Sequence, residues 1–141
     1  MGNTMPTAPQ AAQDSDCIFL WSIHMLATNI HFRHDVEAAR AKGAVVWCID
    51  AYRNKTADLA DHFVAVRPGT DGALALGMMY VLDRDGLADE AFLARNVLGW
   101  EDLKKTVLPK YTLEETQDIT GVPADVIVEL AHATPGPGAV S

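Results

Sequence analysis

Cys17-Ile-Phe-Leu-Trp21 is a continuous apolar run, which is typical of a central strand buried on both faces of a parallel sheet. A second such run, Ala44-Val-Val-Trp-Cys-Ile49, follows further along the chain. Parallel strands need a crossover connection, and the pattern between the two runs predicts a helix over residues 28–42 that ends at Gly43. Because such crossovers are right-handed, residues 17–49 predict one βαβ unit. The side chains expected to face the sheet from this helix are Ile30, Phe32, Val36 and Ala39.

A third buried strand is predicted over residues 62–66, after a short helical segment over residues 55–61. The octapeptide Arg67-Pro-Gly-Thr-Asp-Gly-Ala-Leu74 then joins this strand to a helix. Pro68 and Gly69 end the strand, and Thr70 is a favourable N-cap residue for the helix. This alternation of strands and helices indicates an α/β fold.

The pattern becomes wholly helical from residue 89 onward, with helices predicted over residues 89–97, 100–108, 112–119 and 123–133. Thr112 and Glu115 match a capping box, and Pro123 suits the first position of a helix. We therefore predict a three-layer Rossmann-like parallel sheet with helices on both faces and a helical C-terminal part.

The composition bounds the domain organisation and the partners. A chain of 141 residues with 49% apolar content is long enough for one compact domain. We expect it over residues 16–134, between a flexible leader at 1–15 and a flexible tail at 135–141. The formal net charge of −8 argues against nucleic acid and anionic membranes as partners. The chain shows no signal peptide and no membrane-spanning segment, so we expect a cytoplasmic location.

A binding site is predicted where the three strands end, because open parallel sheets bind ligands at the carboxyl ends of their strands. In the second loop, Asp50 can accept hydrogen bonds from ribose hydroxyls, whereas Arg53 and Lys55 can meet phosphate. The alternatives are a turn-starting aspartate and ordinary surface cations. The candidate cofactor-binding residues are Ser22, Ile23 and His24, then Asp50, Ala51 and Arg53, and finally Pro68, Gly69, Thr70 and Asp71.

Asp71 is the most informative residue of the third loop. It lies at a predicted helix N-terminus, where backbone N–H groups lack partners within the helix. Gly69 and Gly72 leave room for close approach, and a carboxylate can accept from N1–H and N2–H2 of guanine. The alternative is that Thr70 and Asp71 only cap the helix and favour its dipole.

The two cysteines, Cys17 and Cys48, each stand inside an apolar run. We expect both to be reduced, buried core residues in neighbouring strands. Their spacing fits neither a structural zinc site nor an iron–sulfur cluster, so none is expected in this segment.

The order of the strands and loops, with Asp50, Thr56-Ala57, Ala60-Asp61 and the octapeptide, resembles the molybdopterin oxidoreductases. That family includes formate dehydrogenases, nitrate reductases and dimethyl sulfoxide reductases. The resemblance covers about residues 14–133 and includes Leu98-Gly-Trp100, Tyr111-Thr112 and Thr120-Gly-Val-Pro123.

The resemblance implies that this segment holds one molybdopterin guanine dinucleotide. Asp71 would recognise guanine, Asp50 would contact ribose, and the loop after Trp21 would contact the diphosphate. Two loops depart from the family pattern. Trp-Gly-Ser-Asn-Pro is replaced by Trp21-Ser-Ile-His-Met25, and Asp-Pro-Arg is replaced by Asp50-Ala-Tyr-Arg53.

The chain also lacks the metal-ligating residue, the N-terminal cluster and the C-terminal domain of full family members. We therefore expect a piece of a larger molybdenum or tungsten oxidoreductase that is inactive alone. Its partners would be the remaining domains of the same subunit and an electron-transfer subunit.

Two other interpretations remain open. A stand-alone nucleotide-binding protein without redox activity would share the βαβ pattern, although the first loop lacks GxGxxG. A metal site could use His24, His31, His34 and Asp35, although no HExxH motif is present. A nucleophile elbow of the hydrolase type is also missing from the sequence.

Overall fold

The computed structural model describes residues 8–134, so part of the predicted leader and the whole predicted tail lie outside the described residues. The chain divides into two compact units, Met1–Ala65 and Val66–Ser141, where the sequence predicts one domain over 16–134.

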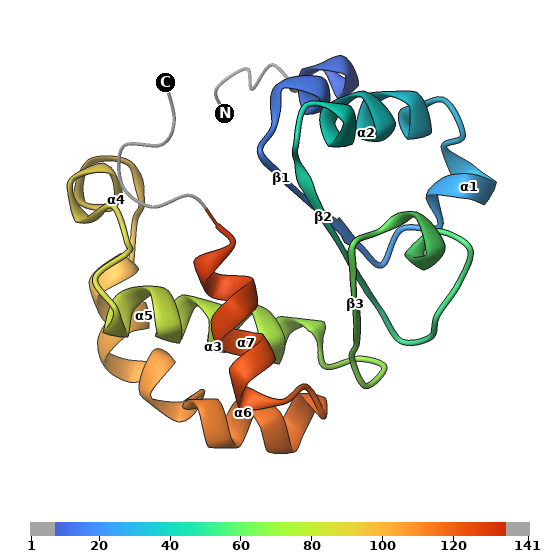
Figure 1. The fold of residues 1–141 in the computed structure, drawn as a ribbon. Helices are drawn as coiled ribbons and strands as arrows, with labels where there is room; N and C mark the ends of the chain where they lie inside the picture. Colours follow the sequence, from blue (N-terminus) through green and yellow to red (C-terminus); the bar gives the residue numbers. More distant parts are fainter. Residues whose placement is uncertain (1–7, 135–141) are drawn as a thin grey trace. The chain divides into compact units, whose positions relative to one another are not determined.

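The first unit contains a three-stranded sheet of β1 (Cys17–Trp21), β2 (Val45–Asp50) and β3 (His62–Ala65) (Figure 1). All strands are parallel, and their order in the sheet is β1-β2-β3. Cys17 pairs with Val45, and Asp50 pairs with Ala65. The predicted strands and the parallel α/β arrangement are confirmed.

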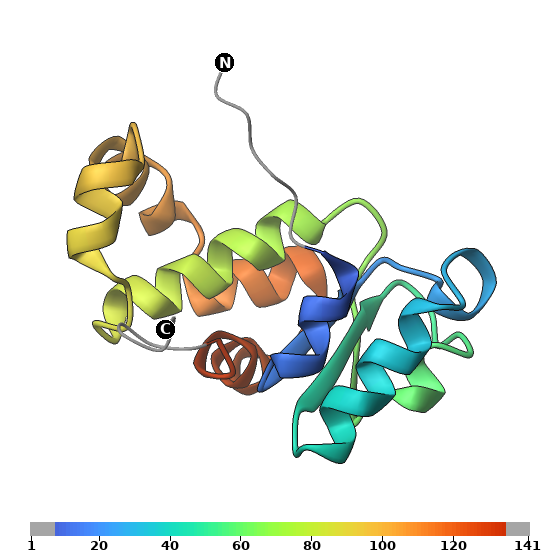
Figure 2. The same ribbon diagram turned by 90° about the horizontal axis from the view of Figure 1, so that it is seen from above.

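The crossover between β1 and β2 is broken into two helices, so the prediction of a single helix over residues 28–42 was wrong. α1 covers Met25–Thr28 and α2 covers Phe32–Ala41. Figure 2 shows α2, in cyan, alongside the strands of the sheet. Asn29 leaves the helical region with φ −146° and ψ 61°, and its N–H donates to the Met25 carbonyl. Ile30 lies in the break and is 59% exposed, whereas Val36 and Ala39 are buried as predicted.

Part of the predicted leader is ordered. Pro9–Asp14 forms the 3-10 helix η1, which is held against α2. Gln13 Nε2 donates to Asp35 Oδ1 at 2.7 Å, and Lys42 Nζ donates to the Gln13 carbonyl at 2.9 Å. Composition did not reveal this segment, because its order depends on contacts with residues more than twenty positions away.

The core of the first unit lies between the sheet and α2. Ile18, Leu20 and Val46 pack with Val36, Ala39 and Met25 in one buried cluster. Cys48 is fully buried in β2, but Cys17 at the start of β1 is only partly buried. The prediction that both thiols are buried was therefore wrong for Cys17. Both are free cysteines, and they lie in neighbouring strands.

The second unit is helical, as predicted, and α3 (Asp71–Arg84) is its longest helix. Leu74 and Val81 of α3 and Ile127 and Leu130 of α7 (Ala124–His132) are fully buried. Thr112 accepts a hydrogen bond from the Glu115 N–H at 3.4 Å, which confirms the predicted N-cap. The remaining elements are α4 (Glu90–Asn96), α5 (Trp100–Thr106), η3 (Leu108–Lys110), α6 (Leu113–Thr120) and α7 (Ala124–His132).

Candidate functional site

The loop after β1 begins with a residue in an unusual backbone conformation. Ser22 has φ 50°, and its N–H donates to the Ile49 carbonyl at 2.8 Å, which ties this loop to the end of β2. Ile23 is half-buried and packs against the core of the first unit. Its side chain therefore has a packing role, whereas Ser22 and His24 are the exposed residues of this loop.

The loop after β2 is built around the Asp50 carboxylate. Asp50 Oδ1 accepts from the Ala51 N–H at 2.7 Å, and Oδ2 accepts from Asn54 Nδ2 at 2.8 Å. Asn54 Oδ1 in turn accepts from the Thr56 N–H at 2.7 Å and from the Ala57 N–H at 3.4 Å. Asp50 thus starts an ordered turn, as the alternative interpretation anticipated, and the Ala51 N–H is already used within the protein.

Sequence reasoning missed Asn54, although a signal was present. Asparagine often bonds to backbone N–H groups two residues further along, as it does here with Thr56. The sequence could reveal that turn, but the donation to Asp50 depends on the folded path of the loop.

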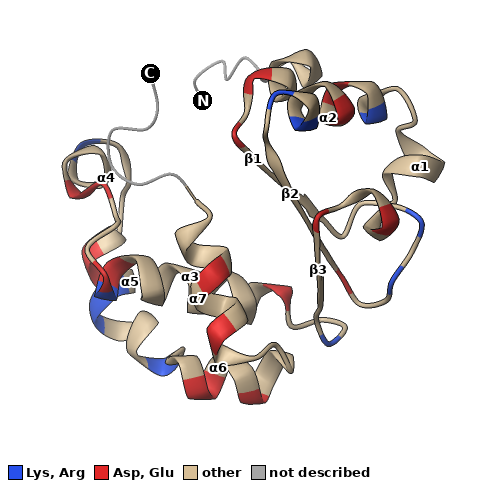
Figure 3. Cartoon of the chain, viewed as in Figure 1, with Lys and Arg blue, Asp and Glu red and all other residues tan. Residues whose placement is uncertain are grey.

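A pocket of about 460 Å³ lies between the two loops of the first unit. It brings the predicted residues His24 and Arg53 together, along with Lys55. Figure 3 shows the Lys and Arg residues on the segment between β2 and β3. Ser22, Ile23, Asp50 and Ala51 are not among the residues that line it. Its lining consists of His24, Leu26, Ala27, Arg53, Asn54, Lys55 and Asp58.

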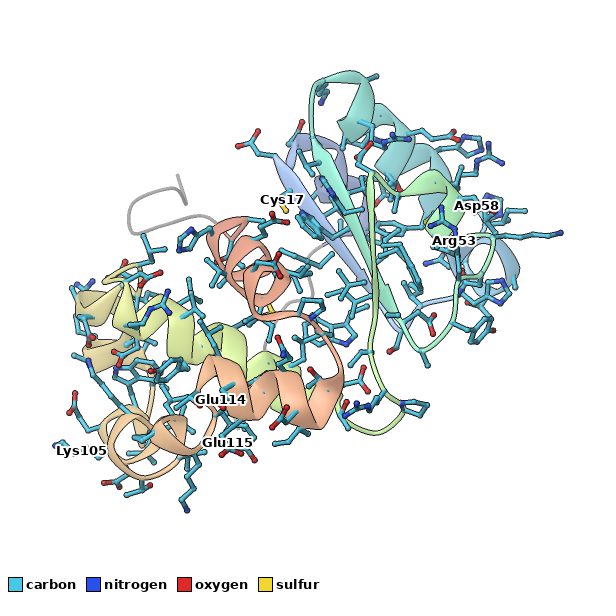
Figure 4. The ribbon with its side chains drawn as sticks, turned by 60° about the horizontal axis from the view of Figure 1, so that its bottom comes forward. Cys17, Arg53, Asp58, Lys105, Glu114 and Glu115 are labelled. Atoms are coloured by element: carbon cyan, nitrogen blue, oxygen red, sulfur yellow. The ribbon has the colours of Figure 1, made fainter. Side chains whose placement is uncertain are left out.

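Arg53 has two interaction partners in the first unit. Its Nε lies 3.3 Å from Asp58 Oδ1, and Figure 4 shows these two side chains close together. Its guanidinium carbon lies 5.6 Å from the centre of the Phe63 ring, within the range of a cation–π interaction. With Arg53, Lys55 and Asp58 on its wall, the pocket carries one more positive charge than negative charge.

The third predicted loop belongs to the second unit. The Arg67 carbonyl accepts from the Thr70 N–H at 3.2 Å and from Thr70 Oγ1 at 2.8 Å. Thr70 is the N-cap residue of α3, but its hydroxyl makes no side-chain cap, so this part of the prediction was wrong. The hydroxyl closes the turn that contains Pro68 and Gly69, and Gly69 has φ 81°. Asp71 is then the first residue of α3.

Arg67 anchors this loop to α6. Its N–H donates to the Thr120 carbonyl at 2.9 Å, and its guanidinium donates to the carbonyls of Asp118 and Ile119. A guanidinium at a helix C-terminus satisfies carbonyls that have no partner within the helix. Arg67 therefore has a structural role that the octapeptide alone did not reveal.

One member of the His24, His31, His34 and Asp35 set considered as a metal site already has a hydrogen-bond partner. Asp35 accepts from Gln13, as described above, and is 9% exposed. Across residues 8–134, no group of three or more His, Cys, Asp or Glu residues is arranged to hold a metal ion. Over the same range, no helix is long and apolar enough to cross a membrane.

Comparisons with known proteins place the chain among oxidoreductases. No family model matches. The probable oxidoreductase YoaE of Bacillus subtilis is 39% identical over 93% of this chain and 19% of its own length. F420-dependent formate dehydrogenase 1 subunit alpha of Methanococcus maripaludis is 34% identical over 84% of this chain and 18% of its own. Dimethyl sulfoxide/trimethylamine N-oxide reductase of Rhodobacter capsulatus is 34% identical over 88% of this chain and 17% of its own length.

A solved structure, acetylene hydratase from Pelobacter acetylenicus, superimposes with a TM-score of 0.73 at 29% identity. It is matched over 87% of this chain and 18% of its own length. The fold thus defines an α/β segment with an open parallel sheet and a helical C-terminal part. The chain belongs to the molybdopterin oxidoreductase family and spans about one fifth of the length of these relatives.

Proposed function

We propose that this chain is the cofactor-binding segment of a larger molybdopterin-dependent oxidoreductase, in which it holds the guanosine part of a molybdopterin guanine dinucleotide. The observation that carries the proposal is its similarity to one fifth of several oxidoreductases over nearly all its own length. Oxidoreductase activity on a substrate is proposed only for the larger protein, and not for this segment. The same holds for a cytoplasmic location and for an electron-transfer subunit as partner.

The pocket of the first unit supports a phosphate-bearing ligand. Arg53 and Lys55 provide cationic donors on its wall, and His24 adds a ring that can donate a hydrogen bond. A volume of about 460 Å³ falls within the usual range for small-molecule sites. These donors fit a diphosphate.

The ribose and the guanine of the dinucleotide would each contact a different residue. Asp50 would accept hydrogen bonds from ribose hydroxyls, because each of its oxygens has acceptor capacity beyond the bonds described above. Asp71, at the start of α3, would accept from N1–H and N2–H2 of guanine. A Cβ added at Gly69 or Gly72 would meet no atom within 4 Å, so the backbone on either side of Asp71 is open to close approach.

The bound cofactor would supply the redox chemistry at its metal. This chain would bind and orient the nucleotide end, and we propose that it has no turnover alone. Elemental analysis of the chain produced together with the cofactor machinery tests this part. Stoichiometric molybdenum or tungsten with dye-linked turnover would overturn it.

Guanine recognition by Asp71 is tested by calorimetric titration with guanosine and adenosine diphosphates. The wild type should prefer the guanine nucleotide, and Asp71→Asn should remove about 1 to 3 kcal/mol of that preference, because one acceptor becomes a donor. Asp125→Asn is the matched control, since Asp125 also lies in the first turn of a helix. Equal wild-type affinities, or an unchanged preference in Asp71→Asn, would return Asp71 to a helix-start role.

The alternative function is a stand-alone nucleotide-binding protein without redox activity. It shares the same predicted contacts, so titration does not separate the two. The coding sequence on either side of this segment does: open reading frames for the missing metal-ligand and C-terminal domains favour the oxidoreductase, and stop codons favour the alternative.

A further inference from the structure

Asn54 joins the Asp50 carboxylate to the backbone of the loop after β2. Its amide nitrogen donates to Asp50 Oδ2 at 2.8 Å, while its amide oxygen accepts from the Thr56 N–H at 2.7 Å. Only 9% of Asn54 is exposed, and Thr56 is fully buried. The amide of Asn54 is therefore buried, its oxygen is held by the Thr56 N–H, and its nitrogen faces Asp50.

The Asp50 carboxylate is held at both oxygens. The Ala51 N–H donates to Oδ1 at 2.7 Å, and Asn54 donates to Oδ2. Two such bonds oppose rotation of the carboxylate about its Cβ–Cγ bond. An ionised carboxylate has about four acceptor positions, so each oxygen keeps about one more.

The remaining acceptor positions match the two adjacent hydroxyls of a ribose. We infer that Asn54 is a positioning residue that holds the Asp50 carboxylate for a ribose cis-diol and thereby makes the site selective for ribonucleotides. This inference rests on the proposed function. Asn54 does not itself contact the ribose and acts through Asp50.

Asn54→Asp separates this role from a merely structural one. The substituted carboxylate keeps an acceptor for the N–H groups of Thr56 and Ala57 but loses the donor to Asp50. It also places a second negative charge beside Asp50, which lowers the affinity for every phosphate ligand. This loss of affinity is the same for both nucleoside diphosphates, so it cancels in the ratio of their affinities for one variant.

The experiment compares guanosine diphosphate with its 2′,3′-dideoxy analogue by calorimetric titration. Two ribose hydrogen bonds should give the wild type a preference of about tenfold. Asn54→Asp and Asn54→Ala should reduce the preference to about threefold or less. Asn96→Asp, which makes the same charge change on α4, should keep the wild-type preference. A full preference retained in both Asn54 variants would overturn the inference.

A second measurement needs no nucleotide. In NMR spectra, one Asn54 side-chain amide proton should exchange slowly with water, and Asp50→Ala should remove that protection. An amide proton that exchanges freely in the wild type would overturn the role of Asn54 alone. A protected proton with equal affinity for the two nucleotides would instead overturn the proposed ribose contact, and with it the role of Asn54.

Discussion

Gly77 in α3 faces Thr116 in α6 with no room for a side chain between the two helices. A Cβ at Gly77 would lie 2.5 Å from Thr116 Cγ2 and 2.6 Å from its Oγ1. Thr116 is fully buried, and its hydroxyl donates to the Tyr111 carbonyl at 3.2 Å. The close approach of α3 and α6 therefore depends on glycine at this position.

Gly77→Ala should lower the free energy of unfolding by about 1 to 3 kcal/mol, because the added methyl forces the helices apart. Gly72→Ala is the matched control in the same helix, since a Cβ there meets no atom within 4 Å. It should be neutral or stabilise by up to about 1 kcal/mol, as alanine favours a helix. Urea denaturation measures both, and equal effects would contradict the packing argument.

Ser22 adopts a backbone conformation that favours glycine. Its φ of 50° lies in the left-handed region. Ser22→Gly should leave stability unchanged or raise it by up to about 1 kcal/mol, because relief of the left-handed strain outweighs the greater freedom of the unfolded chain. Ser22→Val should lower it by about 1 to 2 kcal/mol. Thermal unfolding measures the stability of both variants. If Ser22→Val were more stable than Ser22→Gly, the left-handed conformation at residue 22 would not be retained.

Asp85 should make the stability of the second unit depend on pH in the acid range. Arg84 and His132 hydrogen-bond to its carboxylate, and they hold its pKa well below the ordinary value of 3.8. Since the folded pKa is depressed, the contribution is fully present above the unfolded pKa and is lost as the pH falls toward the folded pKa. Unfolding followed from pH 5 to pH 2 should therefore show falling stability.

Asp85→Asn removes the titrating group, so its stability should vary less over that range than that of the wild type. Asp102→Asn on α5 removes the same charge away from the Arg84–His132 cluster and should keep the wild-type slope. If the stability of wild type and Asp85→Asn fell equally with pH, carboxylates other than Asp85 would determine the pH dependence. Glu90, whose pKa is also lowered by a hydrogen bond from Lys104, would be the next group of the second unit to test.

The two thiols should react at different rates. Cys48 is fully buried, whereas Cys17 is partly exposed, and burial raises the pKa of both thiols. Because the thiolate is the reactive form, native labelling should be slow overall, with Cys17 the faster of the two. Cys17→Ser should remove the faster phase, and Cys48→Ser should leave it. Denaturant should make both residues react rapidly; a disappearance of the faster phase in Cys48→Ser would reverse the assignment.

The sequence by itself determined the strands, the parallel α/β order and the helical second half. Apolar runs such as residues 17–21 and 44–49 depend only on local periodicity, and the capping pattern of Thr112 and Glu115 spans three positions. The resemblance that rests on residues 67–74 and 120–123 also needs no coordinates. These features are local, so a linear pattern is enough to reveal them.

Tertiary structure alone decided which residues of the predicted helices are exposed and how several of the polar groups are partnered. The break after α1 left Ile30 exposed, and contacts with α2 ordered η1. Arg67 bonds to carbonyls about fifty positions away, and Asn54 bonds to Asp50 only because the loop after β2 turns back on itself. Hydrogen bonds require donor and acceptor within about 3 Å in a suitable direction, and that geometry arises only when distant parts of the chain have packed.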